Sequence, residues 1–355
     1  MYRTFIAPLA YVQGPDVLTT DHAGFDHLDG TSAYLLGGST ALSAVGEILV
    51  ETLGTVGIDV IEIETGVKAC TADSIMELTE RAAPADIIVG VGGGVAIDVA
   101  TAVTIETAAE LVSVPTIAST DAPTSTVSVV YDDSGNFTEV RLRDRNPELV
   151  LVDSRVIADA PAQFLRHGMG DAIATRFEAE ACMTANATVT TGGWPNRTAL
   201  HIARHAYDEV AEYGSDALLA AERNAVTPAL ERVIEANTLL SGIGFESAGT
   251  AGAHAIQIGL TNVGVREPHG ELVAFGTLAE LVLQDRPPAL IDNVRSLLVD
   301  LGLDNTLSDF GVSSDDLLRV GELALEHGMA KEPDPASPTG IADAIRFADR
   351  LLDDH

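Results

Sequence analysis

The 355-residue sequence is poor in lysine, in cysteine and in long apolar runs. No apolar run approaches the roughly 18 residues of a membrane-spanning helix. The first residues, MYRTFIAPLAYVQG, lack the apolar segment of a secretory signal. The two cysteines, Cys70 and Cys182, are too few for a disulfide framework. We therefore expect a cytoplasmic protein without membrane segments.

Positive charge is scarce as well, because 20 Lys and Arg stand against 53 Asp and Glu, a net charge of −33. A field of this sign repels phosphate backbones and anionic lipids, so roles on nucleic acids or membrane surfaces are disfavoured. Only Lys68 and Lys331 are lysines, and the other 18 cations are arginine. Since molar salt shortens the Debye length to about 3 Å and relieves such self-repulsion, the composition indicates a halophilic protein.

Apolar residues nevertheless make up 46% of the chain, which predicts a folded protein, and the length predicts about two domains. Up to about residue 160, short β-branched runs alternate with helical patterns. Expected strands include Ala33–Gly37, Asp59–Glu64, Asp86–Gly93 and Glu110–Pro115, with helices over about 40–53, 71–83 and 95–107. This alternation predicts a doubly wound α/β domain. The runs STVSVVY and FTEVRLR around DDSGN predict an additional hairpin.

The second half of the chain has a different texture. From Pro161 onward, segments such as GDAIATRFEAEACMTA, TPALERVIEANTLLSG and GELVAFGTLAELVLQ show helical spacing. We therefore expect an α/β domain over 1–160, an all-helical domain over 161–355, and a ligand site in the cleft between them.

Two segments of the first half favour ligand binding. Three glycines, Gly92, Gly93 and Gly94, separate a buried strand from a helix, where the backbone can approach a pyrophosphate. The alternative is a turn that only reverses the chain. The segment PTIASTDAPTSTVSVVY then follows a strand's carboxyl end, where α/β sheets bind ligands. Its carboxylate, Asp121, could also merely cap a turn.

Three residues of the second half, Asp171, His254 and His269, each lie near the start of an expected helix. Two imidazoles and one carboxylate leave a fourth position open, as in a catalytic zinc site. Other histidines compete equally on spacing: His22, His27, His201, His205 and His327.

Together these blocks resemble the glycerol dehydrogenase branch of the iron-containing alcohol dehydrogenase superfamily. The most specific strings are PTIASTDAPTS and TPALERVIEANTLLSGIGFES, followed by GAHAIQIG and HGELVAFGTL. The resemblance implies a dehydroquinate synthase-like fold, an NAD cofactor, a zinc ion and oxidation of glycerol to dihydroxyacetone. It places zinc on Asp171, His254 and His269, which thereby also face the substrate, and makes Asp121 the catalytic contact to glycerol. The cofactor contacts that it implies are Gly93, Gly94, Val95, Ala96, Ile97, Asp98, Thr116, Ile117, Ala118, Ser119, Ser125, Val127 and Tyr131.

The sequence departs from this resemblance at three places. Iron-using relatives carry a histidine where this chain has Thr175, which favours zinc. The glycine turn usually continues with a lysine, and here Val95 stands in its place. The first strand usually ends in an acidic residue that holds the adenosine ribose, whereas this chain has Gly37 and Gly38, and Gly37 is expected at the position of the carboxylate. NAD is the expected cofactor, and the missing carboxylate leaves NADP as the alternative.

Two related activities remain as alternatives, a glycerol-1-phosphate dehydrogenase and a dehydroquinate synthase-like lyase. Both act on phosphorylated substrates, and residues 113–131 contain neither Lys nor Arg. Arg266, close to His269 in sequence, is the cation that could answer this objection. The resemblance further implies a homo-oligomer.

Overall fold

The computed structural model describes residues 2–20 and 24–353. Contacts divide the chain into two compact units. The sheet unit comprises Ile6–Leu165 and Asp216–Gly242, and the helical unit comprises the remaining described residues. The domain limits expected from the sequence, 1–160 and 161–355, remain a prediction. No helix of the described chain is both long and apolar enough to cross a membrane.

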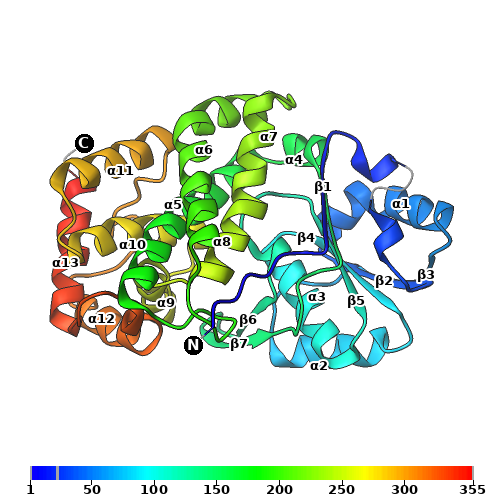
Figure 1. The fold of residues 1–355 in the computed structure, drawn as a ribbon, viewed down its shortest axis with the longest axis horizontal. Helices are drawn as coiled ribbons and strands as arrows, with labels where there is room; N and C mark the ends of the chain where they lie inside the picture. Colours follow the sequence, from blue (N-terminus) through cyan, green and yellow to red (C-terminus); the bar gives the residue numbers. More distant parts are fainter. Residues whose placement is uncertain (1, 21–23, 354–355) are drawn as a thin grey trace. The chain divides into compact units, whose positions relative to one another are not determined.

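The sheet unit is built on six parallel strands in the order β1-β8-β5-β4-β2-β3 (Figure 1). Their bounds are β1 Ala10–Gly14, β2 Ser32–Gly37, β3 Asp59–Glu64, β4 Ile87–Gly92, β5 Glu110–Pro115 and β8 Leu149–Asp153. The helices that connect or follow them are α1 Ser39–Thr55, α2 Ala72–Ala82, α3 Gly94–Thr107 and α4 Ser154–Asp159. Strands that alternate with helices in this way confirm the predicted doubly wound α/β architecture.

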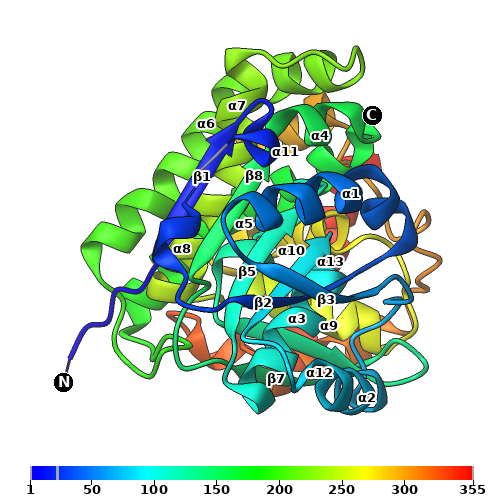
Figure 2. The same cartoon turned by 90° about the vertical axis from the view of Figure 1, so that its right-hand side faces the viewer.

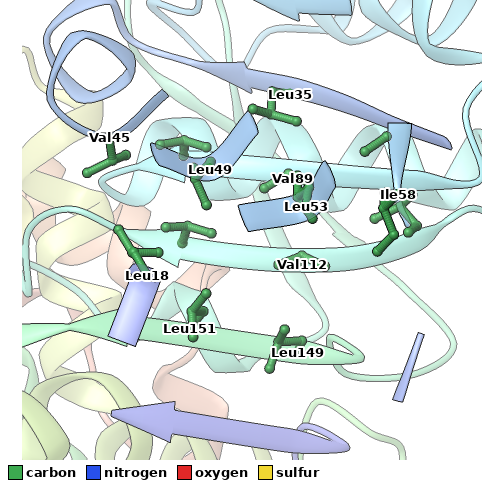
Figure 3. Packing of buried hydrophobic residues seen from close by; sticks show 14 of the residues in the cluster. Leu18, Leu35, Val45, Leu49, Leu53, Ile58, Val89, Val112, Leu149 and Leu151 are labelled. Carbon is green, nitrogen blue, oxygen red and sulfur yellow. The ribbon is translucent and has the colours of Figure 1, made fainter. Parts of the chain in front are cut away.

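Both faces of the sheet are buried, which explains why its central strands read as nearly continuous apolar runs. Leu35 of β2 packs in one apolar cluster with Leu49 of α1, while its neighbour Leu36 packs in another with Val99 and Val103 of α3. Helix α1 therefore covers one face, and α2 and α3 cover the other (Figure 2). Figure 3 shows the α1 side, where Leu35, Val89, Val112 and Leu151 present a continuous apolar surface.

Short elements complete the sheet unit. Strands β6 Val127–Tyr131 and β7 Phe137–Leu142 form the predicted antiparallel hairpin. Helix α7, Pro228–Glu235, continues through a π-helical turn, Ala236–Leu240, into α8, Ser241–Ala248, most of which belongs to the helical unit. Single 3-10 turns lie at Val17–Thr19, Phe25–His27 and Ala122–Thr124.

Helices dominate the second half of the chain, as the sequence predicted. They are α5 Ala162–Ala185, α6 Arg197–Ala221, α9 Gly252–Asn262, α10 His269–Leu283, α11 Pro288–Leu301, α12 Leu317–Glu326 and α13 Pro338–Asp353. Another 3-10 turn spans Met329–Lys331. Helix α10 packs against α9 and α13, and both of those contact α12. The sequence analysis did not identify β1, whose five residues are only half-buried at the edge of the sheet.

Candidate functional site

Helices α5 and α10 of the helical unit cross with their backbones in direct contact. A Cβ added at Gly270 would lie 1.7 Å from the carbonyl oxygen of His167, and one at Gly170 would lie 2.1 Å from that of Gly270. No other residue type fits these two positions without a shift of the backbone. Because each glycine adjoins a ligand candidate, the crossing brings Asp171 and His269 together.

A second close approach brings in the third candidate. A Cβ at Gly276 of α10 would meet the carbonyl oxygen of Ala253 at 2.5 Å, so α9 lies against α10 one residue before His254. Ligand atoms of Asp171, His254 and His269 lie within 4.8 Å of one another. Oδ1 of Asp171 lies 3.4 Å from Nε2 of His254 and 3.2 Å from Nε2 of His269.

The Asp171 carboxylate has the character of a metal ligand rather than of a structural group. It is fully buried, and neither oxygen makes a hydrogen bond to the residues that the structure describes. Burial alone raises the pKa of this carboxyl, but the facing imidazoles of His269 and His254 lower it below its ordinary value. The two imidazoles offset the burial of this anion, and a cation between the three side chains would do the same. Two imidazole nitrogens and one carboxylate oxygen therefore fit a divalent transition-metal ion.

Glu178 lies two turns after Asp171 on α5, and it holds the His254 imidazole. Its Oε2 lies 2.7 Å from Nδ1 of His254, and its Oε1 accepts the backbone N–H groups of Ala251 and His254 at 2.7 and 2.9 Å. Burial lowers the pKa of His254, but the Glu178 and Asp171 carboxylates outweigh it and raise the pKa well above its ordinary value. A proton on Nδ1 leaves Nε2 to face Asp171, as metal ligation requires.

The competing histidines do not join this cluster. His201 and His205 lie on α6, and His205 points to Glu209 with 3.6 Å between Nε2 and Oε1. His27 ends a 3-10 turn of the sheet unit, and His327 follows α12. His22 lies outside the described residues. Among those described, no other group of three His, Cys, Asp or Glu side chains meets in a metal-like arrangement.

In the sheet unit, the glycine turn connects β4 directly to α3. Gly92 has φ +144°, a conformation that side chains rarely adopt. A Cβ at Gly93 would lie 2.7 Å from Cδ1 of Ile117, so the bare turn packs against the segment that follows β5. Thr116 N donates to the carbonyl oxygen of Gly92 at 3.1 Å. The structure thus brings two of the predicted cofactor segments, 93–98 and 116–119, side by side at the carboxyl edge of the sheet.

The hairpin lies against the other side of α3. Ser128 of β6 donates its hydroxyl to the Asp98 carbonyl oxygen at 2.8 Å, and Tyr131 N donates to the Cys70 carbonyl oxygen at 2.9 Å. The carboxyl of Asp98 is buried, which raises its pKa to about 8 although the backbone N–H of Val129 opposes the shift. Ser125, Val127 and Tyr131 therefore belong to the same neighbourhood as Asp98.

The end of β2 differs from the sequence interpretation in one detail. At Gly37 a Cβ would lie 2.2 Å from the carbonyl oxygen of Val91, so no side chain fits there. At Gly38 the nearest atom, the carbonyl oxygen of Val67, is 3.8 Å away. Of these two glycines, only Gly38 therefore has room for a side chain.

Asp121 lies after β5 in a polar, buried setting. Its Oδ2 accepts the Ser241 hydroxyl at 2.7 Å. In the same neighbourhood, Asn237 of the π-helical turn donates from Nδ2 to the carbonyl oxygens of Ala118 and Leu165, at 3.0 and 2.9 Å. The turn thereby fixes the loop that carries Asp121.

Comparisons with known proteins identify the family of this chain. Residues 12–161 match the family described as iron-containing alcohol dehydrogenase. A glycerol dehydrogenase from Thermotoga maritima is 46% identical over 75% of this chain and 75% of its own length. A glycolaldehyde reductase from Halobacterium salinarum is 38% identical over 99% of this chain and 98% of its own length. The chain belongs to the iron-containing alcohol dehydrogenase family.

A solved structure of the same family supports the fold. The crystal structure of glycerol dehydrogenase from Schizosaccharomyces pombe superposes with a TM-score of 0.94 at 33% identity, covering 99% of this chain and 92% of that one. This similarity confirms the predicted family and its dehydroquinate synthase-like fold. Family membership implies a metal ion and a nicotinamide cofactor, for which the two clusters above offer ligands.

Sequence reasoning missed several supporting residues. Glu178 lies two helical turns after Asp171, so the same face of α5 carries both, a signal that could have been found from spacing. Ser241 and Asn237 give no such signal, because their partners in the segment 118–121 are remote in sequence.

Proposed function

We propose that this protein oxidises glycerol to dihydroxyacetone, with transfer of a hydride to a nicotinamide dinucleotide. The observation that carries the proposal is that His254 and His269 converge on the buried carboxylate of Asp171. Relatives named glycerol dehydrogenase support the choice of substrate. A divalent ion held by these residues would supply Lewis acidity that lowers the pKa of a substrate hydroxyl.

Zinc is the ion that the donor set favours. Thr175 lies one turn after Asp171 on α5, at the position where the iron-using relatives carry a histidine. Its side chain is buried and donates back to the Asp171 carbonyl oxygen at 3.0 Å. A hydroxyl engaged in this way adds no fourth protein ligand, so two nitrogens and one oxygen remain, with an open position for substrate.

Asp121 is the proposed substrate residue. A buried carboxylate accepts hydrogen bonds from the hydroxyl groups of a polyol, and Ser241 orients it through the 2.7 Å contact to Oδ2. The cofactor would lie along Gly93–Asp98, Thr116–Ser119, Ser125 and the β6 residues Val127 and Tyr131, with its pyrophosphate at the glycine turn. NAD is the proposed cofactor and NADP the alternative.

Phosphorylated substrates fit the site less well. Residues 113–131 hold neither Lys nor Arg, and Arg266 already donates from Nη1 to the carbonyl oxygens of Thr261 and Val265, at 2.6 and 2.8 Å. A glycerol-1-phosphate dehydrogenase or a lyase acting on a phosphorylated acid is therefore disfavoured. Glycolaldehyde reduction is the second candidate, since a full-length relative carries that name.

Two features of the wider setting are also part of the proposal. Cys70 and Cys182 are buried and unpaired, which fits a reducing compartment such as the cytoplasm. Relatives of this type suggest a homo-oligomer, and the net charge of −33 suggests a halophilic source.

Steady-state kinetics of the purified protein test the function. We expect glycerol oxidation with NAD to give a higher kcat/KM than glycerol 1-phosphate with either cofactor. A larger kcat/KM for glycolaldehyde reduction would favour the second candidate. Replacing His254 by Ala should abolish activity and tightly bound zinc, whereas His205→Ala should retain both. Full zinc occupancy in His254→Ala would refute the metal assignment.

A further inference from the structure

A pocket of about 500 Å³ opens in the sheet unit beside the glycine turn. Its wall contains Val95 of that turn, Tyr131 of β6, and the loop after β3 that carries Lys68. Two of these three residues belong to the proposed cofactor site. Lys68 comes from a segment that neither the sequence motifs nor the family resemblance connected with a ligand.

The pocket has two cations, and only one of them is available to a ligand. Arg81 is paired with Glu62 and Glu64. Lys68 is exposed, and it makes no ion pair or side-chain hydrogen bond with any residue of the described chain. Lys68 is also one of only two lysines in a chain with 53 acidic residues.

The loop of Lys68 is attached to the end of β2. Val67 N donates to the carbonyl oxygen of Gly37 at 3.3 Å, and Gly38 and Gly66 form an isolated β-bridge. Strand β2 pairs with β4, which leads into the glycine turn. Lys68 is therefore placed by backbone contacts near two positions that matter for a dinucleotide, the turn and the strand end without a carboxylate.

We propose that Lys68 binds a phosphate group of the nicotinamide dinucleotide. The proposal rests on the proposed function, since it takes the glycine turn as the cofactor site. The turn has no cation of its own because Val95 follows Gly94. Glu77, Asp132 and Asp133 line the same pocket, so an incoming phosphate meets negative charge that only Lys68 is free to offset.

Cofactor binding to the metal-free protein tests this assignment without any turnover. Dissociation constants for NADH and NADPH are measured by nicotinamide fluorescence for the wild type, Lys68→Gln, Lys68→Arg and Lys331→Gln. Lys331 is the matched control, because it is the other lysine and lies in the helical unit. We expect Lys68→Gln to weaken binding roughly three- to tenfold, Lys68→Arg to restore most of it, and Lys331→Gln to resemble the wild type.

The two cofactors identify which phosphate is bound. An equal loss for NADH and NADPH assigns Lys68 to the pyrophosphate, and a loss confined to NADPH assigns it to the 2′-phosphate. Unchanged dissociation constants for both cofactors in Lys68→Gln would overturn the assignment while leaving the proposed function intact. Failure of the wild type to bind either cofactor would refute the proposed function, and the Lys68 assignment with it.

Discussion

Nδ1 of His254 lies 2.7 Å from Oε2 of Glu178, and this buried carboxylate determines which imidazole nitrogen faces Asp171. Partners of this kind raise the basicity of a ligating histidine and typically contribute 10- to 100-fold to metal affinity. Glu178 reaches the proposed metal site through His254, so it acts as a positioning residue.

We predict that Glu178→Gln weakens zinc binding by about tenfold. The amide still accepts a hydrogen bond but carries no charge. As the pH is lowered, protons compete with zinc for the His254 imidazole, so zinc affinity should fall. Glu178 raises the pKa of His254, so in Glu178→Gln this loss of affinity should begin at a lower pH. Chelator competition at several pH values measures both effects.

Glu280→Gln is the matched control. Glu280 is an equally buried carboxylate that accepts Ala253 N at 3.0 Å, but it does not contact His254. Burial raises its pKa well above its ordinary value, with a further contribution from Glu332, so the amide resembles the protonated acid that it replaces. Equal zinc affinities in Glu178→Gln and Glu280→Gln would contradict the positioning role.

A second prediction concerns the helix crossing. Gly270→Ala puts a methyl group 1.7 Å from the carbonyl oxygen of His167, so α5 and α10 must separate and carry Asp171 away from His269. We expect a lower Tm and at least tenfold weaker zinc binding. Gly54→Ala on α1 has nothing within 4 Å of the new methyl group and should be neutral or stabilising by about 0.5–1 kcal/mol. Unchanged zinc affinity in Gly270→Ala would show that the crossing does not position the ligands.

The sheet unit could be predicted because the buried faces of its strands require apolar residues that are visible in the sequence. Both faces of β4 are covered, so Ile87–Gly92 is wholly apolar or glycine, and β-branched residues distinguish it from a helix. Strand β1 was missed because AYVQG at the edge is too short and too polar to carry that signal. The register that pairs it with β8 arises only from tertiary contacts.

The proposed metal ligands came from the family resemblance, because spacing alone left five other histidines equal to His254 and His269. What selects them is the close approach at Gly170, Gly270 and Gly276, where the neighbouring backbone excludes any Cβ. A sequence shows the glycines but not the backbone that each one meets. The same reason explains why the sequence favoured Gly37 as the carboxylate position, although the carbonyl oxygen of Val91 leaves no room there for a side chain.

Cofactor preference gives a third prediction. Gly38→Asp places a carboxylate just after β2 without a steric clash, and there it would accept hydrogen bonds from the adenosine ribose and repel a 2′-phosphate. The ratio of kcat/KM for NAD to that for NADP should rise by about tenfold or more. Gly37→Asp should instead lower Tm, because its Cβ meets Val91. An unchanged ratio in a stable Gly38→Asp protein would place the ribose elsewhere.

The buried Asp98 gives a prediction about pH. Desolvation raises its pKa from 3.8 to about 8, so between those values the folded protein holds a proton that the unfolded chain has lost. Stability from this group is complete below pH 3.8 and is lost as pH rises toward 8. Asp98→Asn removes this pH dependence. As the pH rises, the unfolding free energy of the variant should therefore increase relative to that of the wild type by up to about 1.4 kcal/mol per pH unit. Denaturant titrations between pH 5.5 and 8.5 measure it, and a constant difference would contradict the assignment.

The last prediction concerns salt and follows from the net charge of −33. In dilute buffer the same field opposes folding and the approach of an anionic cofactor to a turn that continues with Val95. At ionic strengths near 1 M, screening over about 3 Å removes most of this penalty. Tm should therefore rise, and the apparent KM for the cofactor should fall, from low salt into the molar range.

The identity of the salt separates screening from specific ion binding. KCl and NaCl should act alike at equal concentration if screening dominates, because the Debye length depends on ionic strength alone. A strong preference for one cation would instead indicate bound ions among the exposed carboxylates. Full activity and an unchanged Tm in low-salt buffer would refute the halophilic interpretation. That outcome would leave the proposed metal centre intact, since its carboxylate, Asp171, is buried and little affected by screening.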